Sequence, residues 1–129
     1  MKANLRKLIG TTVLGLAMFS NDIPAWAGQR LLTEVTVGTS SASGTMVGAR
    51  YSTDKQQYIG CLLYESRFEE SVGCAAQDKT GKSFSCFSRD PRWVTVVKAM
   101  TESSYISVEA DASGSCTSLT IENYSSHLR

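Results

Sequence analysis

Apolar and polar side chains alternate along most of the chain after residue 30, and this period of two is typical of β-strands. Short clusters of Gly, Ser, Asp and Lys separate the alternating runs and favour turns. The pattern predicts strands at residues 33–37, 45–52, 57–64, 71–77, 82–88, 105–110 and 115–123. It predicts a loop over residues 38–44, which are mostly Ser, Thr and Gly.

Two of the predicted turns share the pattern Asp-x-x-Gly, at residues 78–81 and 111–114. An Asp side chain can accept hydrogen bonds from the backbone that follows it, and Gly adopts the positive φ that closes a tight turn. Each turn lies between two strand-like runs. The sequence therefore predicts two β-hairpins.

One segment breaks the strand pattern. Asp90 is a good helix N-cap and Pro91 suits the first helical position. Trp93, Val96, Val97 and Met100 then fall on one helical face, although the β-branched residues at 94–97 would also suit a strand. We expect an α+β fold, mainly antiparallel β. It would contain a six- to seven-stranded sheet or partly open barrel, with one helix at about residues 91–101 before the final hairpin.

The N-terminus has the pattern of a cleaved export signal. Basic residues precede an apolar run from Leu8 to Phe19, and Ala25-Trp26-Ala27 suits signal peptidase. That run of 12 residues is shorter than the ~18 to 20 that a membrane-spanning helix needs. We expect residues 1–27 to be a signal peptide and residues 28–129 to be one secreted or periplasmic domain, with no membrane span after cleavage.

All four cysteines lie after the predicted cleavage site, and an oxidising compartment favours two disulfides. Cys61, Cys74 and Cys86 lie on the apolar faces of three successive strands, whereas Cys116 is out of phase with the apolar residues of its own strand. We expect either a bulge near Thr117 or a different face for Cys116. Three pairings are open. Cys61–Cys74 with Cys86–Cys116 is favoured over Cys74–Cys86 with Cys61–Cys116, and Cys61–Cys86 with Cys74–Cys116 is the third.

The charge balance argues against nucleic acid as a partner. The chain has 13 basic and 12 acidic side chains. The predicted signal peptide takes three of the basic and one of the acidic groups, which leaves 10 against 11 and a net charge of −1. A near-neutral domain has little long-range attraction for nucleic acid or an anionic membrane.

Residues for catalysis or metal binding are sparse. The only histidine is His127, the third residue from the end of the sequence, and the cysteine spacing does not suit zinc. The four Asp residues after the signal peptide all lie at predicted turns or at the helix cap: Asp54, Asp78, Asp90 and Asp111. We therefore expect no catalytic residues, no metal and no cofactor.

Two features are candidates for binding. The first is the loop from Glu65 to Glu70, where Phe68 lies beside Arg67 and Glu69. An aromatic residue among charges is typical of an interface anchor with a polar rim. A solvated loop tip is the simpler interpretation, and a catalytic carboxylate pair is the weakest.

The second candidate is the strand at residues 57–64, which is apolar on both faces. Its second face carries Tyr58, Leu62 and Tyr64, and Phe87 joins them from a later strand. We expect the predicted helix to cover this face through Trp93. The alternative is an exposed patch for a protein or carbohydrate partner.

Several short segments together resemble a group of short exported bacterial proteins that carry four cysteines and have no assigned activity. The likeness covers roughly residues 45–124. It rests on Tyr58-Ile59-Gly60-Cys61, Asp78 with Gly81, Cys86 ahead of Asp90-Pro91, Ser104-Tyr105-Ile106, and Asp111 to Thr117. The resemblance implies export and a disulfide-stabilised fold, and it implies no activity.

The sequence thus favours a small exported binding or interaction module without catalytic activity, acting as a monomer on an unknown protein or carbohydrate. One alternative is an enzyme inhibitor or a hydrolase that uses the loop from Glu65 to Glu70. Another is a structural component of an envelope assembly.

Cleavage between Ala27 and Gly28 is testable by substitution. Ala27→Asp places a charge where signal peptidase accepts small side chains, so unprocessed precursor should accumulate. N-terminal sequencing of the exported wild type should begin at Gly28. Met1 at the N-terminus of the exported species would contradict the prediction.

Overall fold

A computed structural model describes residues 32–124; the predicted signal peptide and His127 lie outside the described residues. The elements in order are β1 (Thr36–Val37), β2 (Ser41–Thr45), α1 (Met46–Arg50), β3 (Tyr58–Glu65), β4 (Glu70–Gln77), β5 (Ser83–Ser88), α2 (Pro91–Lys98), β6 (Tyr105–Ala110) and β7 (Cys116–Glu122). The fold is α+β and mainly antiparallel, as predicted.

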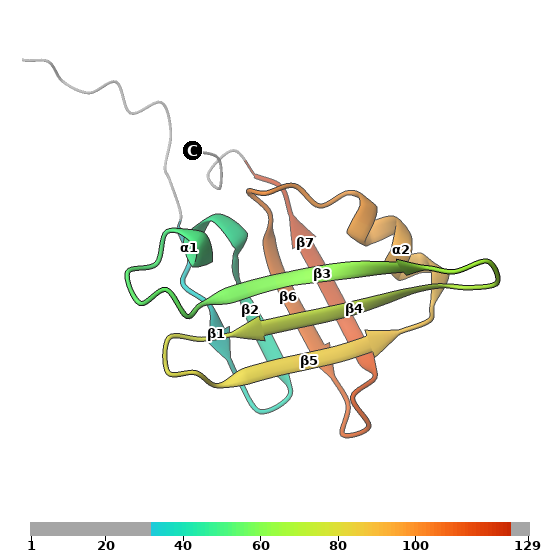
Figure 1. Ribbon diagram of the computed structural model, residues 1–129, viewed down its shortest axis with the longest axis horizontal. Coiled ribbons are helices and arrows are strands. Elements are labelled where there is room, and N and C mark those ends of the chain that lie inside the picture. Colours follow the sequence, from blue (N-terminus) through green and yellow to red (C-terminus); the bar gives the residue numbers. More distant parts are fainter. Residues whose placement is uncertain (1–31, 125–129) are drawn as a thin grey trace, which may run out of the picture.

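The strands form two sheets rather than the single sheet of six or seven strands that the sequence predicted. One sheet has the order β1-β2-β6-β7 and the other has the order β3-β4-β5 (Figure 1). Each neighbouring pair is antiparallel. The sheets meet at one isolated bridge between Phe87 and Ser115, where the Phe87 N–H donates to the Gly114 carbonyl at 3.0 Å. One bridge does not make a ladder, so no closed barrel forms.

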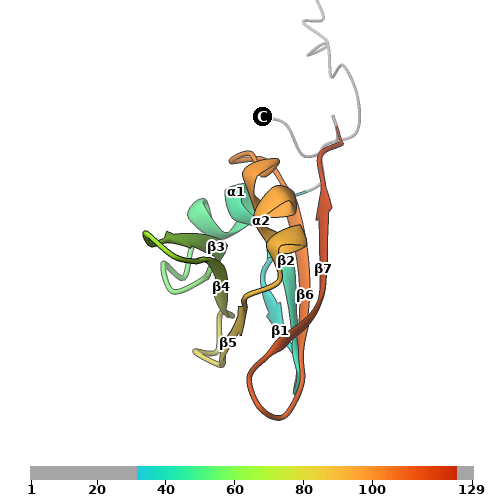
Figure 2. The same ribbon diagram turned by 90° about the vertical axis from the view of Figure 1, so that its right-hand side faces the viewer.

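The core lies between the two sheets, which face each other as separate layers (Figure 2). Both helices lie at one end of the space between the layers. The largest fully buried apolar side chains come from both sheets: Val72 from β4, and Ile106 and Val108 from β6.

Both Asp-x-x-Gly turns have the predicted geometry. Oδ1 of Asp78 accepts the backbone N–H groups of Thr80 and Lys82 at 2.8 and 3.1 Å, and Gly81 has φ +86°. Asp111 and Gly114 repeat this arrangement, with Gly114 at φ +82°. The hairpins β4–β5 and β6–β7 are therefore confirmed.

The helix after Asp90 is also confirmed, and it is shorter than predicted. Asp90 accepts the N–H of Arg92 at 2.9 Å, and Pro91 occupies the first turn. The helix ends at Lys98 instead of residue 101, because the backbone tightens there into the turns that lead to Ser104, whose Oγ accepts the N–H of Thr101 at 2.8 Å.

Residues 45–52, predicted as a strand, instead contain α1. Thr45 is fully buried, and its Oγ1 caps the helix by accepting the N–H of Gly48 at 3.0 Å. The same hydroxyl donates to the carbonyl of Thr33 at 3.1 Å. A Cβ at Gly48 would overlap that carbonyl, so Gly is needed where the two backbones meet. The prediction of a single helix was therefore wrong.

Residues 38–44, predicted as a loop, include most of β2. This strand has a ladder on each side, with β1 and with β6, from Ser41↔Glu109 to Thr45↔Tyr105. Ala42 and Gly44 leave room for the close packing of the core, and Ser41 and Ser43 point outward. Strand formation here depends on tertiary pairing rather than on local preference.

The cysteines form two disulfides, Cys61–Cys74 and Cys86–Cys116, and no described cysteine is free. Cys61 and Cys74 are directly opposite each other on β3 and β4. Of the two alternatives for Cys116, the structure has the bulge near Thr117: the adjacent residues Glu109 and Ala110 pair with Ser118 and Cys116, which skips one residue of β7. The bulge turns Cys116 toward Cys86.

The two disulfides should differ in their effect on stability. Chain entropy alone assigns about 3 kcal/mol to a loop of the Cys61–Cys74 size and closer to about 4 kcal/mol to one of the Cys86–Cys116 size. The second bond also joins the two sheets. Cys86→Ala with Cys116→Ala should therefore lower the free energy of unfolding in urea more than Cys61→Ala with Cys74→Ala. An equal loss, or the reverse order, would contradict this assignment.

Candidate functional site

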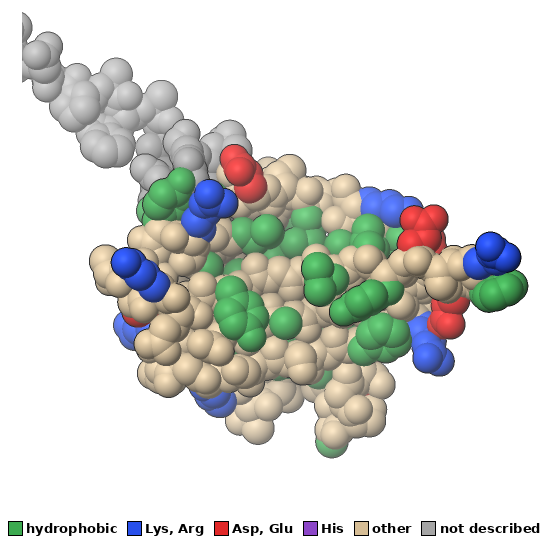
Figure 3. Space-filling view, in the orientation of Figure 1, with side chains coloured by type: hydrophobic (Ala, Val, Ile, Leu, Met, Phe, Trp, Pro, Cys, Tyr) green, Lys and Arg blue, Asp and Glu red, His purple; other side chains and the backbone are tan. Residues whose placement is uncertain are grey.

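The outer face of the β3-β4-β5 sheet carries the largest group of exposed apolar side chains. Leu62 is 63% exposed and Tyr64 is 52% exposed, and Tyr58 and Phe87 are exposed as well. The register places Leu62, Gly73 and Phe87 in one row across the three strands. Figure 3 shows hydrophobic side chains, in green, spread over this face and separated by backbone and other side chains, in tan. We call the exposed Tyr58, Leu62, Tyr64 and Phe87 the apolar face.

This position contradicts the expectation that the predicted helix covers the apolar face. Helix α2 lies on the opposite side of the sheet, between the two layers (Figure 2), where Val94 and Val97 are buried. Trp93 is partly buried against the same core. The strand β3 is apolar on both sides because one side packs in the core and the other is exposed.

Small residues form the floor of the apolar face. Gly73, Ala75 and Ser85 lie between the larger side chains and line a shallow hollow of about 290 Å³. A Cβ added to Gly73 would lie 3.0 Å from Cε2 of Tyr64, so this ring rests almost directly on the backbone. No ionisable acid or base lines the hollow, apart from the Tyr64 hydroxyl. Its chemistry suits contact with apolar groups and not proton transfer.

Charged side chains border the apolar face at the end near the β3–β4 hairpin. The guanidinium of Arg89 lies 5.7 Å from the centre of the Phe87 ring and pairs with Glu69 at 3.0 Å. Tyr64 and Phe87 are tilted toward each other with their ring centres 6.3 Å apart. The arrangement is an apolar centre with a charged rim.

The hairpin between β3 and β4 projects beyond the rest of the described domain (Figure 1). Ser66 holds the turn: its N–H donates to the Glu69 carbonyl at 2.9 Å, and its Oγ accepts the Glu69 N–H at 3.1 Å. Phe68, at the tip beside Arg67, is 93% exposed. The loop from Glu65 to Glu70 therefore presents an exposed aromatic ring.

A second hollow, of about 250 Å³, lies between α1 and the first residues of β3. The sequence gives no sign of this hollow, because its pattern predicts a strand at residues 45–52, where the structure has α1. Its wall is apolar, with Arg50 and Glu102 among the lining residues. The full lining is Met46, Val47, Ala49, Arg50, Gln57, Tyr58, Ile59 and Glu102.

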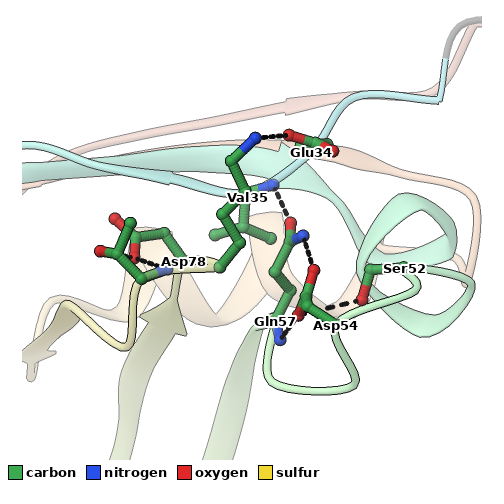
Figure 4. A network of polar contacts seen from close by, with 8 residues as sticks. Glu34, Val35, Ser52, Asp54, Gln57 and Asp78 are labelled. Carbon is green, nitrogen blue, oxygen red and sulfur yellow. Dashed lines mark hydrogen bonds and ion pairs between the residues drawn. The ribbon is translucent and has the colours of Figure 1, made fainter.

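A polar network beside this hollow fixes the start of β3 (Figure 4). Buried Gln57 accepts the N–H of Val35 at 2.7 Å, and its amide donates to Oδ2 of Asp54 at 2.5 Å. The backbone N–H groups of Gln56 and Gln57 donate to Oδ1 of Asp54 at 2.8 and 3.1 Å. Every described buried side-chain polar atom has a partner, so the network is structural.

The aspartates have lowered pKa values for structural reasons. The side-chain hydrogen bond from Gln57, followed by the backbone N–H of Gln56, lowers the pKa of Asp54. Hydrogen bonds within their turns, first from Thr80 and Ser113, lower the pKa of Asp78 and Asp111. The side chain of Arg92 lowers the pKa of Asp90. None of these carboxylates is poised to exchange a proton near neutral pH.

Other chemistry is sparse in the described part of the chain. Residues 32–124 contain no group of three or more His, Cys, Asp or Glu side chains that could hold a metal ion. Over the same residues no helix has the length and hydropathy needed to cross a membrane. The chain matches no family model, no curated protein and no solved structure.

Because Phe68 is exposed, we expect its substitution to have little effect on stability. Phe68→Ala should change the free energy of unfolding by no more than about 0.5 kcal/mol, because the ring contacts mainly solvent. Phe84→Ala is the matched control: that ring is 8% exposed. Its loss should cost about 3 to 5 kcal/mol. Equal losses in thermal melts of the two variants would contradict the position of Phe68.

The Asp54 network predicts a pH dependence. Folding lowers the pKa of Asp54, so its stabilising effect is present above its unfolded pKa of about 4 and is lost as pH falls through the folded pKa. Asp54→Asn keeps the shape and one acceptor but removes the charge. The variant should be less stable than wild type at pH 7, and the difference should narrow in urea titrations at pH 2–4. A difference that stays constant with pH would contradict the assignment.

Proposed function

We propose that this chain is a small exported binding module without catalytic activity, and that its partner is a protein. The observation that carries the proposal is the apolar face, because large exposed apolar patches with polar rims mark interaction surfaces. Two disulfides fit the oxidising compartment that export implies. The domain contacts the partner with the apolar face and with the Phe68 tip.

A protein partner suits the apolar face better than a carbohydrate does. The hollow is lined by Leu62, Tyr64 and Phe87 over small residues, and its polar side-chain groups are the hydroxyls of Tyr64 and Ser85. A sugar would need convergent hydrogen-bonding groups beside the aromatic rings. Arg89 and Glu69 already pair with each other, which suits a rim rather than a sugar-binding floor.

Inhibition of an enzyme is the second candidate, and the projecting hairpin favours it. Phe68 stands at the end of a turn held by Ser66, so the ring is presented with little flexibility in the backbone behind it. A rigid exposed aromatic side chain can enter a pocket of a partner at low entropic cost. Binding would then depend on Phe68 more than on Leu62.

Site-specific photo-crosslinking tests the proposal. A photoreactive residue in place of Phe87 should give a discrete crosslinked protein in the exporting cell. The same residue in place of Thr120 is the control, because that position lies on the outer face of the other sheet. Equal crosslinking at both positions, or none at Phe87, would contradict a binding role for the apolar face.

The retrieved protein then allows a quantitative test. Tyr64→Ser with Phe87→Ser should weaken its binding at least about tenfold, as expected for central interface residues. Phe68→Ala distinguishes an enzyme inhibitor from a general binding module, because binding by the inhibitor would depend mainly on Phe68. The last variant combines Glu65→Gln, Glu69→Gln and Glu70→Gln. If the wild type turns over a substrate and this triple variant does not, the absence of catalysis is contradicted.

A further inference from the structure

The register of β3 shows which of its backbone groups point away from β4. In an antiparallel pair, closely spaced residues do not exchange hydrogen bonds with each other, and widely spaced residues do. The Cα atoms of Cys61 and Cys74 are 4.0 Å apart, which makes them a closely spaced pair. Continued past Glu65, the same alternation predicts that Ser66 and Glu69 are a hydrogen-bonded pair. The Ser66 N–H does donate to the Glu69 carbonyl, at 2.9 Å. The odd-numbered residues of β3 therefore direct their N–H and C=O groups outward.

Those outward groups lie on a free edge. β3 is the last strand of its sheet, and among residues 32–124 no hydrogen bond reaches the N–H or C=O of Ile59, Cys61 or Leu63 from that side. The side chains of the same three residues lie on the side of the sheet that faces the core, where Ile59 is buried and Leu63 is 41% exposed. The edge thus offers a regular row of backbone donors and acceptors.

The other sheet edges are protected, and β3 is not. β1 has only two residues, β7 carries the bulge at Thr117, and β5 is covered where Phe87 bonds Gly114. Short strands, bulges and covering loops are the usual means of blocking strand addition. β3 has eight residues, no bulge and no proline, and its only charged residue is the last, Glu65.

Apolar surface lies along both sides of this edge. The hollow of about 250 Å³ between α1 and β3 opens beside Ile59. Leu62, Leu63 and Tyr64 are exposed farther along the strand. Figure 3 shows hydrophobic side chains in the band between β3 and the helices.

We propose that the free edge of β3 binds an extended segment of a partner protein, which adds as a fourth strand to the β3-β4-β5 sheet. This inference rests on the proposed binding function and names the conformation of the partner. The unpaired backbone groups select an extended main chain. Side chains on one side of the added strand enter the apolar hollow beside α1, and those on the other side lie at the outer face of the sheet, toward solvent. The segment is therefore apolar at alternate positions.

An added segment fits this edge better than a second copy of the chain. α1 lies against the first half of β3 and forms the wall of the hollow. Two copies paired edge to edge would bring both α1 helices into the interface. A bare extended segment brings no helix.

Leu63→Pro tests the edge directly. The N–H of Leu63 points away from β4, so proline removes an outward donor without removing a ladder bond of the sheet, and proline is tolerated on such edges. Leu63→Ala is the matched control, because it removes the same side chain and keeps the N–H. Melting temperatures would show that both variants are folded.

The probe is a displayed library of random 12-residue peptides, selected on the purified, disulfide-bonded protein. Selected peptides should be apolar at alternate positions. Leu63→Pro should weaken their binding at least about tenfold, and Leu63→Ala should weaken it less than about threefold. In wild-type protein, a bound peptide should slow hydrogen exchange at the amides of Ile59, Cys61 and Leu63, a measurement that does not depend on any variant folding.

The remaining outcomes overturn the inference. One such outcome is that the selected peptides bind the Leu63→Pro variant as tightly as wild type but bind the Tyr64→Ser, Phe87→Ser double variant more weakly. This result would support the apolar face as the binding site and overturn strand addition. No selected peptide, or no protection of the three amides, would also overturn it. Self-association that Leu63→Pro abolishes, measured by sedimentation without peptide, would assign the edge to a second copy instead.

Discussion

The junction between β5 and β7 holds the two sheets together, and the rest of the arrangement depends on it. The sheets share one backbone bridge, Phe87–Ser115, and the Cys86–Cys116 disulfide beside it. Side-chain packing in the core and the polar contacts of Glu34 with Lys79 and of Val35 with Gln57 add to this junction. Because the layers are joined at β5, the opposite strand, β3, lies at an open side. The helices fill the space between the layers there and leave the backbone edge of β3 unpaired.

A domain of this size has a modest core, so covalent links replace some of the packing that a larger domain would have. Cys86–Cys116 joins the layers. Cys61–Cys74 does something different, because it joins two strands that are already paired along their length. It fixes β3, an edge strand with a partner on one side only, to β4. An unprotected edge would otherwise be the part of this sheet most prone to fray.

Local chemistry made part of the fold predictable. The two Asp-x-x-Gly turns and the Asp90-Pro91 start of α2 depend on side chains that bond their own backbone, so residues a few positions apart determine them. The bulge at Thr117 could also be inferred, since Cys116 was out of phase with Leu119 and Ile121. Each of these signals lies within a single element or turn.

The errors came from long-range effects. β2 consists of small residues with weak strand preference, and it forms because β1 and β6 pair on both sides of it. α1 depends on buried Thr45, whose hydroxyl bonds both Thr33 and Gly48. Neither interaction can be recognised without knowing which segments meet. The division into two sheets follows from the same cause, because the seam between β5 and β7 is a single bridge.

The candidate site could be predicted only in part, because its exposure also depends on how distant segments pack. The sequence identified the residues of the apolar face and the Phe68 loop, but a strand that is apolar on both sides fits a buried strand and a half-exposed one equally well. The position of α2 decides between them, and that position depends on how Val94 and Val97 pack between the layers. The free edge of β3 could not be predicted at all, since an edge is a property of strand order.

The apolar face and the free edge belong to the same strand, and this has a cost and a use. An exposed, regular, uncharged edge favours non-specific pairing between chains. The cost is limited here because the projecting hairpin ends in charged residues, and because two copies could pair at this edge only by bringing both α1 helices into the interface. The use is preorganisation. The disulfide Cys61–Cys74 keeps β3 extended before any partner arrives, so an incoming segment bears most of the ordering entropy and the domain itself loses little. Gly60 on β3 and Gly73 on β4 leave the outer face of the sheet without side chains at two positions, and the Tyr64 ring occupies the space above Gly73. The space above Gly60 is open in the described structure, in the first half of the strand that the partner would join.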